Sequence, residues 1–335
     1  MDEPDGQMVP LAYGLAKGVF HHEKKDRVFL IRRFPLKTVS LHSLWKPAVR
    51  LFSQNPYVAV EDVVSLFETE HAARVEQMLT DLARKGFLAQ RGRAELAVFP
   101  AISIIIPVHN RPCEIAACLE SIEKLDYPKE RLETIVVDDA STDHTPKIIS
   151  RFPVRRILLE ENRQAPFCRN LAAKEARGDI LAFVDSDCLV SPLWLKELLP
   201  TFSDLSVAVV GGRVDAWFDR SALDRYEAAN SSLIMGRHPM RSEKGNSSLY
   251  VPSCNMLVRR EVFLAVDGFR EHLVVGEDVD LCWRIRDSGY QVAFEPAGAV
   301  FHKHRNRIPA FCLRRFDYGT SEPLLQKHHK TRRKK

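Results

Sequence analysis

The stretch Ile180-Leu181-Ala182-Phe183-Val184-Asp185-Ser186-Asp187 decides the fold expected for this chain. Five apolar residues in a row are typical of a strand that is buried on both faces, as in a parallel sheet covered by helices. Asp185 and Asp187 follow directly, so the strand delivers two carboxylates to its C-terminal edge. Ligands of open α/β sheets bind at that edge, and paired carboxylates suit Mg2+ or Mn2+. We therefore expect a divalent-cation site here, although Asp-x-Asp also occurs in solvated turns.

Two further apolar strands are expected upstream of this one, at residues 102–106 and 134–137. Segments with the spacing of amphipathic helices separate the strands, at residues 114–125, 145–152 and 167–176. Strands that alternate with helices imply crossover connections between parallel strands. The expected fold is therefore α/β, with a Rossmann-like and mainly parallel sheet.

The strand at residues 134–137 also runs into acidic residues, Asp138 and Asp139. Asp143 follows a few residues later, where a carboxylate can cap the next helix, so an ordinary structural role accounts for it. No capping role accounts for Asp139. We therefore expect Asp139 to face the same ligand site as the Asp-x-Asp pair.

Five motifs in sequence order resemble those of family 2 glycosyltransferases, which have the GT-A fold. The likeness runs over about residues 100 to 305 and rests on Ser-Ile-Ile-Ile-Pro-Val-His-Asn-Arg at 103–111, Ile-Val-Val-Asp-Asp-Ala-Ser-Thr-Asp at 135–143, Cys-Arg-Asn-Leu-Ala at 168–172, Phe-Val-Asp-Ser-Asp at 183–187 and Gly-Glu-Asp-Val-Asp-Leu-Cys-Trp-Arg at 276–284. The resemblance implies a nucleotide-sugar-dependent hexosyltransferase with a UDP-sugar donor.

The same resemblance implies roles for individual residues. Asp139 would read the uracil ring, the pair Asp185 and Asp187 would hold Mg2+ or Mn2+ on the diphosphate, and Asp278 would be the catalytic base. His109 stands where many relatives have Tyr, and its imidazole can still stack on a base. The nucleotide-sugar site is expected to contain Pro107, His109, Asn110, Asp139, Arg169, Asp185 and Ser186.

The chemistry of sugar transfer leads to similar assignments. A leaving nucleotide diphosphate develops negative charge, which a cation held by Asp185 and Asp187 would neutralise. The attacking hydroxyl has a pKa far above 7, so a carboxylate must accept its proton, and a single displacement of this kind inverts the anomeric carbon. Glu277 and Asp278 are the catalytic candidates, although they also begin an expected helix and can act as its caps. Arg169 adds a cation to the crevice or is a solvated helix charge.

Further candidates come from the last part of the likeness. Residues 296–302 follow an expected strand at 291–294 and resemble the family's closing segment, whose His can ligate the metal. His302 is therefore a candidate third metal ligand, with His304 as its competitor, although a His after a strand is often only a hydrogen-bonded structural residue. We expect the acceptor to lie near Asn255, Trp283 and Arg284, while noting that aromatic residues at helical spacing often belong to the core.

The composition is that of an enzyme rather than a membrane-spanning protein. The 335 residues, 45% of them hydrophobic, are enough to bury two cores. No apolar stretch reaches the ~18 to 20 residues of a membrane span, and the polar, acidic residues 1–7 are not expected to be a signal peptide. Seven cysteines without a Cys-x-x-Cys motif favour reduced thiols. We therefore expect a cytoplasmic protein.

The net charge of +5 is unevenly distributed. Residues 302–335 carry eleven Lys and Arg against two acidic residues. We expect residues 311–335 to form a basic C-terminal tail. Such a tail can attract anionic lipid, which would allow peripheral contact with the inner face of the membrane, or it can simply keep the chain soluble.

Residues 1–98 are expected to form a separate, winged-helix-like α+β domain. The pattern predicts a hairpin over residues 19–31, a helix from Val39 to Phe52, and helices at 60–67 and 70–85. Between residues 60 and 85 there are six acids and three bases, which is a poor surface for nucleic-acid phosphates. We therefore expect no nucleic-acid partner.

This N-terminal domain resembles the PqqD-like domains that bind precursor peptides, which can add a peptide as a strand at a sheet edge. Fused to a family 2 glycosyltransferase domain at residues 99–310, it resembles the mycofactocin-system glycosyltransferases. That resemblance implies glucose transfer from UDP-glucose to a peptide-derived acceptor. The alternatives are glycan or polysaccharide assembly, or a winged-helix regulator or peptide-binding protein with an inactive transferase-like domain. Neither Gly-x-Gly-x-x-Gly nor Gly-x-x-x-x-Gly-Lys-Ser/Thr occurs, which disfavours a dehydrogenase or a kinase.

Overall fold

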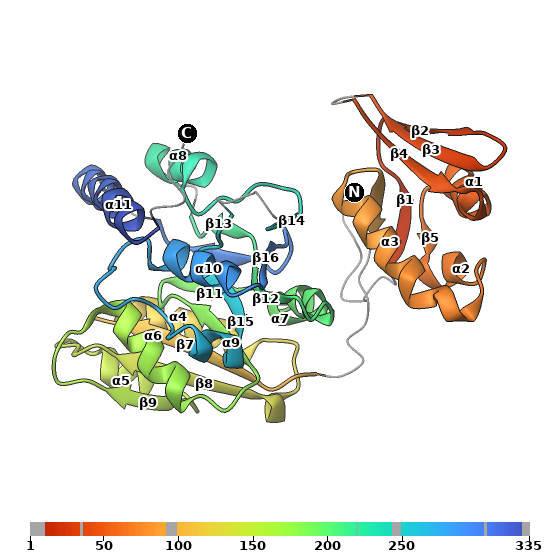
Figure 1. Ribbon diagram of the computed structural model, residues 1–335. Helices are drawn as coiled ribbons and strands as arrows, with labels where there is room; N and C mark the ends of the chain where they lie inside the picture. The colour runs from red at the N-terminus through yellow and green to blue at the C-terminus, as the bar shows by residue number, and fades with distance from the viewer. Residues whose placement is uncertain are drawn as a thin grey trace. The chain divides into compact units, whose positions relative to one another are not determined.

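The computed structural model of the chain contains two compact units, Met1–Glu95 and Leu96–Lys335. Figure 1 shows the helices and strands of each unit. The structure describes residues 11–33, 36–91, 99–218, 220–242, 249–304 and 307–329.

An eight-stranded sheet forms the centre of the larger unit, in the order β14-β16-β12-β15-β10-β7-β8-β9. The predicted strands at residues 102–106, 134–137 and 180–184 are confirmed, and they run parallel to one another. The sheet is nevertheless mixed, because β15 is antiparallel to both of its neighbours, β10 and β12. Its strands are β7 (Ile102–Val108), β8 (Leu132–Asp138), β9 (Arg155–Leu158), β10 (Ile180–Val184), β12 (Val207–Gly211), β14 (Met240–Arg241), β15 (Asn255–Arg259) and β16 (Gln291–Phe294).

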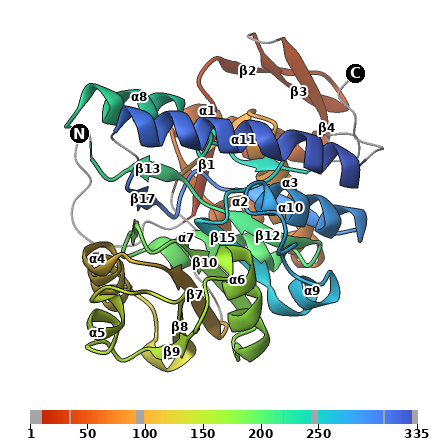
Figure 2. The ribbon, with the colours of Figure 1, turned by 90° about the vertical axis from the view of Figure 1, so that its left-hand side faces the viewer.

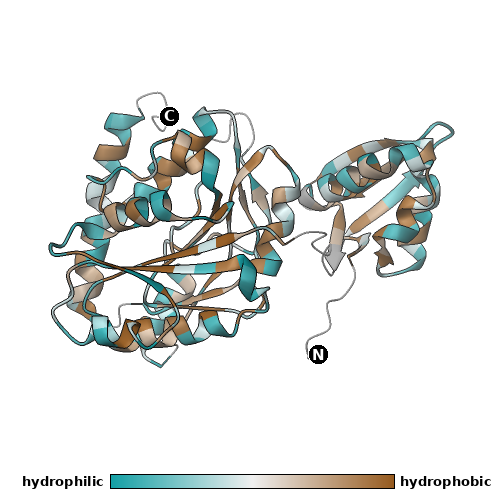
Figure 3. Cartoon of the chain, turned by 90° about the horizontal axis from the view of Figure 1, so that it is seen from below, coloured by the Kyte–Doolittle hydropathy of each residue, from teal (hydrophilic) through white to brown (hydrophobic). Residues whose placement is uncertain are grey.

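Helices cover both faces of this sheet. Successive side chains of a strand point to opposite faces, so Ile104 and Ile106 of β7 join one core cluster and Ile105 joins the other. Figure 3 shows the apolar stretches of the strands in brown. One face packs against α4 (Pro112–Glu123), α5 (Thr145–Ile149) and α7 (Trp194–Leu198), and the other against α6 (Gln164–Glu175), α9 (Arg260–Ala265) and α10 (Glu277–Asp287).

A second, three-stranded sheet brings distant segments to the end of β10. It consists of β11 (Cys188–Val190), β17 (Val300–His302) and β13 (Val214–Ala216), with β17 in the middle. In the antiparallel pair of β11 and β17, Cys188 lies opposite His302. Because Asp187 precedes Cys188, strand pairing places His302 beside the predicted Asp-x-Asp site.

The C-terminal segment differs from the tail that the sequence led us to expect. Ile308–His328 form a 21-residue helix, α11, which lies beside α8 (Ala222–Asn230) and α10 (Figures 1 and 2). Phe311 packs its ring edge-on against Tyr226 of α8, and Leu325 is buried. These apolar contacts explain why a segment rich in basic residues is ordered. Residues 330–335 of the expected tail lie outside the described residues.

The smaller unit contains two three-stranded antiparallel sheets, β5-β1-β6 and β2-β3-β4, and three helices. The prediction of a helix starting at Val39 is wrong. Val39 and Leu41 alternate with exposed residues and pair with Leu30 and Val28, which is strand periodicity. The elements are β1 (Ala12–Leu15), β2 (Val19–Glu23), β3 (Arg27–Arg32), β4 (Lys37–His42), α1 (Lys46–Gln54), β5 (Val58–Ala59), α2 (Val60–Val64), α3 (Ala72–Arg84) and β6 (Leu88–Arg91).

Candidate active site

A cavity of about 1520 Å³ lies at the carboxyl ends of β7, β8 and β10 in the larger unit. Helices α6, α10 and α11, the last turn of α8, and residues 252–254 and 302–304 also line it. Ligands of open α/β sheets bind at this end of the strands. Most of the residues predicted from the sequence line it, namely Pro107, His109, Asn110, Asp139, Arg169, Asp185, Ser186, Asp187, Glu277, Asp278, Trp283 and His302.

Arg169 of α6 connects two groups of carboxylates in this cavity. Its side chain is 3% exposed and donates to Asp185 at 2.6 Å and to Glu277 at 3.0 Å. Those two carboxylates come from the end of β10 and the start of α10, which are almost a hundred residues apart in sequence. The pKa of Arg169 is raised, because its ion pairs outweigh the effect of burial. The guanidinium is therefore a permanently charged link, not a solvated helix charge.

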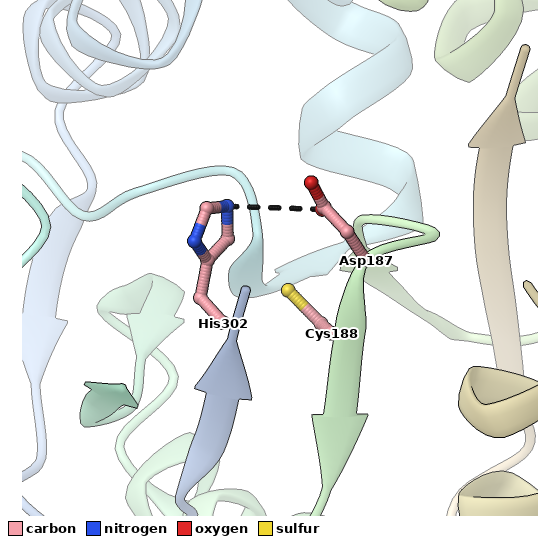
Figure 4. A group of neighbouring side chains, drawn as sticks. All are labelled: Asp187, Cys188 and His302. Carbon is pink, nitrogen blue, oxygen red and sulfur yellow. Dashed lines mark ion pairs between the residues drawn. The ribbon is translucent and has the colours of Figure 1, made fainter. Parts of the chain in front are cut away.

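Asp187 has different partners from Asp185. One carboxylate oxygen accepts a hydrogen bond from Arg111, and the other lies 3.7 Å from Nε2 of His302. Figure 4 shows the Asp187 and His302 side chains pointing toward one another, with Cys188 beside them. Burial favours the neutral form of Asp187, but His302 and Arg111 outweigh it and the pKa of Asp187 is lowered. Asp187 therefore stays charged, as a cation ligand must.

Three neighbouring side chains, Asp187, Cys188 and His302, could offer ligand atoms to a metal ion, but only two of them suit a divalent cation. Potential ligand atoms of Asp187, Cys188 and His302 lie within 4.8 Å of one another. Nδ1 of His302 is buried and has no hydrogen-bond partner among the described residues. Burial raises the pKa of the Cys188 thiol far above its ordinary value, so the thiolate that binds metals is disfavoured there. Asp187 and His302 therefore fit Mg2+ or Mn2+, with Asp185 adjacent but bound to Arg169.

The structure separates the two candidate histidines. His304 also lines the cavity, but its Nδ1 lies 3.9 Å from Glu227 of α8 rather than near the Asp-x-Asp carboxylates. Burial and the neighbouring His302 lower the pKa of His304 to about 4, so it is neutral at pH 7. Of the two, His302 is the histidine that lies beside Asp187.

Glu277 and Asp278 occupy the first turn of α10, whose N-cap is Gly276 in the left-handed conformation (φ 82°). Asp278 accepts hydrogen bonds from the backbone amides of Val279, at 2.8 Å, and Ser253, at 3.4 Å. Burial raises the pKa of Asp278, and it raises the pKa of Glu277 to about 7, with a further contribution from the Asp278 charge. Raised carboxyl pKa values in a cavity are typical of groups that exchange protons.

The loops after β7 and β8 are joined by hydrogen bonds. Nδ1 of His109 donates to the backbone carbonyl of Asp139 at 2.7 Å, and the side-chain oxygen of Asn110 accepts from the amide of Thr142 at 2.8 Å. The Asp139 carboxylate accepts backbone amides at 2.6 and 2.9 Å from the start of α6. Asp139 therefore does have a structural role, although each oxygen keeps a lone pair that can accept from a ligand.

Two of the three predicted acceptor residues are structural instead. Asn255 is fully buried, donates to the carbonyls of Arg213 and Gly298, and accepts from the Trp194 indole at 2.8 Å. Arg284 binds Asp280 at 2.7 Å and the carbonyls of Val266 and Gly268. Neither residue lines the cavity, because these side chains form hydrogen bonds to backbone carbonyls and to buried partners. Trp283 does line the cavity, with its ring edge-on to His329.

Several cavity residues were not predicted from the sequence. Arg111, which binds Asp187, is the last residue of the motif at 103–111, and its place in that motif was an available signal. Several others lie on α11, where the spacing of three, four and seven residues marks one face of a helix. These α11 residues are Phe311, Arg314, Arg315, Tyr318, Ser321 and Leu325.

Comparisons with known proteins agree with this geometry. Residues 103–266 match the model of Glycosyl transferase family 2. The chain is 32% identical to glycosyltransferase AglE of Haloferax volcanii, over 59% of this chain and 65% of that protein. It is 31% identical to the pre-mycofactocin glycosyltransferase of Mycobacterium tuberculosis, over 68% of this chain and 48% of that protein.

The fold resembles that of a mannosyltransferase from Pyrobaculum calidifontis, a GT-A glycosyltransferase. The TM-score is 0.52 at 24% identity, over 66% of this chain and 63% of that one. The chain thus spans about half to two thirds of the length of the relatives it matches. The family match, the fold and the cavity agree: residues 103–266 are similar to glycosyl transferase family 2 domains, and the fold is similar to that of GT-A glycosyltransferases.

Proposed function

We propose that this chain transfers a hexose from a nucleotide diphosphate sugar to an acceptor hydroxyl, with inversion at the anomeric carbon. The observation that carries the proposal is the position of Arg169, whose buried guanidinium binds Asp185 and Glu277 at once. Arg169 therefore links Asp185, at the strand ends, with Glu277, which precedes the proposed base Asp278, in one cavity. Transfer of a sugar with inversion requires a group that binds the leaving diphosphate and a base for the acceptor hydroxyl, on opposite sides of the reacting carbon.

In this proposal each carboxylate group has its own task. Asp278 accepts the proton of the acceptor hydroxyl, which its raised pKa favours. Glu277 stays bound to Arg169 and positions it. Asp187 and His302 hold Mg2+ or Mn2+, with Asp185 beside them, and the bound cation supplies neutralisation of the diphosphate charge. Pro107, His109, Asn110, Asp139 and Ser186 surround the nucleotide.

For the substrates, we propose UDP-glucose as donor and a peptide-derived acceptor, in mycofactocin biosynthesis. The named mycobacterial relative supports this choice, as does the likeness of residues 1–98 to PqqD-like domains. The smaller unit contains a three-stranded antiparallel sheet with β2 and β4 at its edges, and an extended peptide can add to such an edge. Glycan or polysaccharide assembly is the competing function of the same site.

A donor screen tests the proposal. The Pyrobaculum mannosyltransferase was solved with GDP-mannose and Mn2+, so the screen includes GDP-mannose beside UDP-glucose, UDP-galactose and UDP-GlcNAc. Release of nucleotide diphosphate is measured with and without Mn2+ and Mg2+. We expect cation-dependent release from UDP-glucose above all others. If calorimetry detects binding of none of these donors, the result would contradict the proposal and favour a peptide-binding protein with an inactive transferase-like domain.

We also propose a cytoplasmic protein that touches the membrane peripherally through α11. Among the described residues, none of the helices combines the length and the apolar composition that crossing a bilayer requires. Helix α11 nevertheless exposes Ile308, Leu313 and Phe316 by 60 to 71%. Cosedimentation with anionic vesicles should fall when Leu313 and Phe316 are both replaced by Ser, and neutral vesicles should bind neither protein.

A further inference from the structure

Six cationic side chains of Lys and Arg line the cavity, and most of them are already paired. Arg169 binds Asp185 and Glu277, Arg111 binds Asp187, Lys303 binds Glu114 at 2.7 Å, and Arg315 binds Glu227 at 2.6 Å. Among the residues that the structure describes, no carboxylate forms a salt bridge with the other two, Arg307 and Arg314. Arg307 is exposed at the N-cap of α11, where water solvates it. Arg314 is different.

Arg314 is a half-buried cation on the cavity wall. Its guanidinium lies over the ring of Tyr318, one turn further along α11, at 4.7 Å from the ring centre. Burial disfavours its charge, but Tyr318, Glu277 and Asp185 outweigh burial and the pKa of Arg314 is raised. The side chain therefore remains charged while it faces a cavity rather than open solvent. A desolvated cation of this kind is costly unless an anion completes its pairing.

The helix that carries Arg314 is anchored at both of its sides. On one side, Arg315 pairs with Glu227 of α8. On the other, Ser321 and Leu325 pack so closely on Gly276 that a Cβ there would lie 3.1 to 3.2 Å from them. Gly276 is the N-cap of the helix that begins with Glu277 and Asp278. Arg314 is thus fixed relative to the proposed catalytic carboxylates, as a substrate contact must be.

We propose that Arg314 is an anion-binding residue of the substrate cavity, which pairs with a phosphate or carboxylate group of a bound substrate. The inference rests on the proposed nucleotide-sugar function and adds a residue that none of the sequence motifs contains. Two sources carry such an anion: the diphosphate of the donor, and an anionic group on the acceptor. A fork-shaped guanidinium stacked on a tyrosine ring presents its free N–H groups to either one.

The test uses the full chain and two matched variants on the same helix. Arg314→Gln removes the unpaired cavity charge, and Lys327→Gln removes an exposed charge in the last turn of the same helix, outside the cavity. Dissociation constants are measured by calorimetry for UDP and GDP with Mn2+, and then for inorganic phosphate titrated into protein saturated with UDP and Mn2+. Circular dichroism and thermal unfolding establish that each variant is folded.

If the donor is the source, Arg314→Gln weakens nucleotide binding about 10- to 100-fold, the loss expected for one charge-assisted contact. If the acceptor is the source, nucleotide binding is unchanged and the phosphate site of the UDP-saturated protein disappears. Lys327→Gln should stay within twofold of the parent in both titrations. The inference is overturned if Arg314→Gln matches the parent in both titrations. A parent protein that binds neither UDP nor GDP would instead overturn the proposed function.

Discussion

The two sides of the cavity differ in how their carboxylates are held. At the strand ends, Asp185 and Asp187 each bind an arginine, and the pKa of Asp187 is lowered. At the start of α10, burial raises the pKa values of Glu277 and Asp278. One side therefore keeps its negative charge at neutral pH, while the other is close to taking up a proton. The difference separates a side suited to binding charge from a side suited to moving protons.

The largest effect is expected when a negative charge is removed from the strand ends. Asp187→Asn should lower turnover by at least about 100-fold and abolish cation-dependent nucleotide binding, because it removes a ligand for the cation that offsets the diphosphate. Nucleotide release and calorimetry with Mn2+ measure the two effects. Asp179→Asn, at the exposed start of the same strand, is the matched control and should behave like the parent. Full activity of Asp187→Asn, or of the parent in EDTA, contradicts the assignment.

The helix side is tested by Asp278→Asn. The amide cannot accept the acceptor's proton, so turnover should fall by about 100- to 10,000-fold while affinity for the donor stays close to that of the parent. Single-turnover kinetics and donor titrations separate the two quantities. Asp287→Asn, at the other end of α10 and outside the cavity, serves as control. Loss of donor affinity with an unchanged rate per bound complex would make Asp278 a binding or capping residue.

The raised pKa of Glu277 makes a smaller, pH-dependent prediction about stability. Folding raises this pKa from an ordinary 4.5 to about 7, so the folded chain prefers the protonated form. Stability from this source is complete below pH 4.5 and is lost as the pH rises through about 7. The parent should therefore lose about 1–3 kcal/mol more between pH 5 and 8 than Glu277→Gln does. Urea unfolding in EDTA at several pH values measures this, and parallel pH profiles would contradict it.

The smallest effect on the cavity is expected from deletion of the N-terminal unit, which contributes none of the described cavity residues. Deletion of residues 1–95, which form a separate compact unit, should leave cation-dependent donor hydrolysis within about twofold, because every cavity residue lies beyond residue 106. Transfer to a peptide-linked acceptor should weaken, since a docked strand raises the local acceptor concentration. Titrating the isolated unit with leader peptides and with duplex DNA decides its role. Salt-sensitive DNA binding without peptide binding would support a regulator.

Residues adjacent in sequence were the easiest to place from the sequence. Asp185 and Asp187 directly follow an apolar strand, so their place at the sheet edge followed from strand periodicity alone. Asp280, by contrast, is an acidic residue in the first turn of α10 for which the sequence predicted no role. It is fully buried and binds Arg284, Arg270 and His329, the last residue described in the C-terminal segment. Only its spacing of four from Arg284 could have been noticed in advance.

The sequence by itself determined the α/β class and the strand-end carboxylates, because short-range periodicity and composition encode them. Only the tertiary structure decided which charges meet. The links from Arg169 to Glu277, from Asp187 to His302, and from α11 to α8 and α10 join segments about a hundred residues apart or more, or depend on how helices pack. Such contacts arise from strand order and helix packing, which no local pattern specifies.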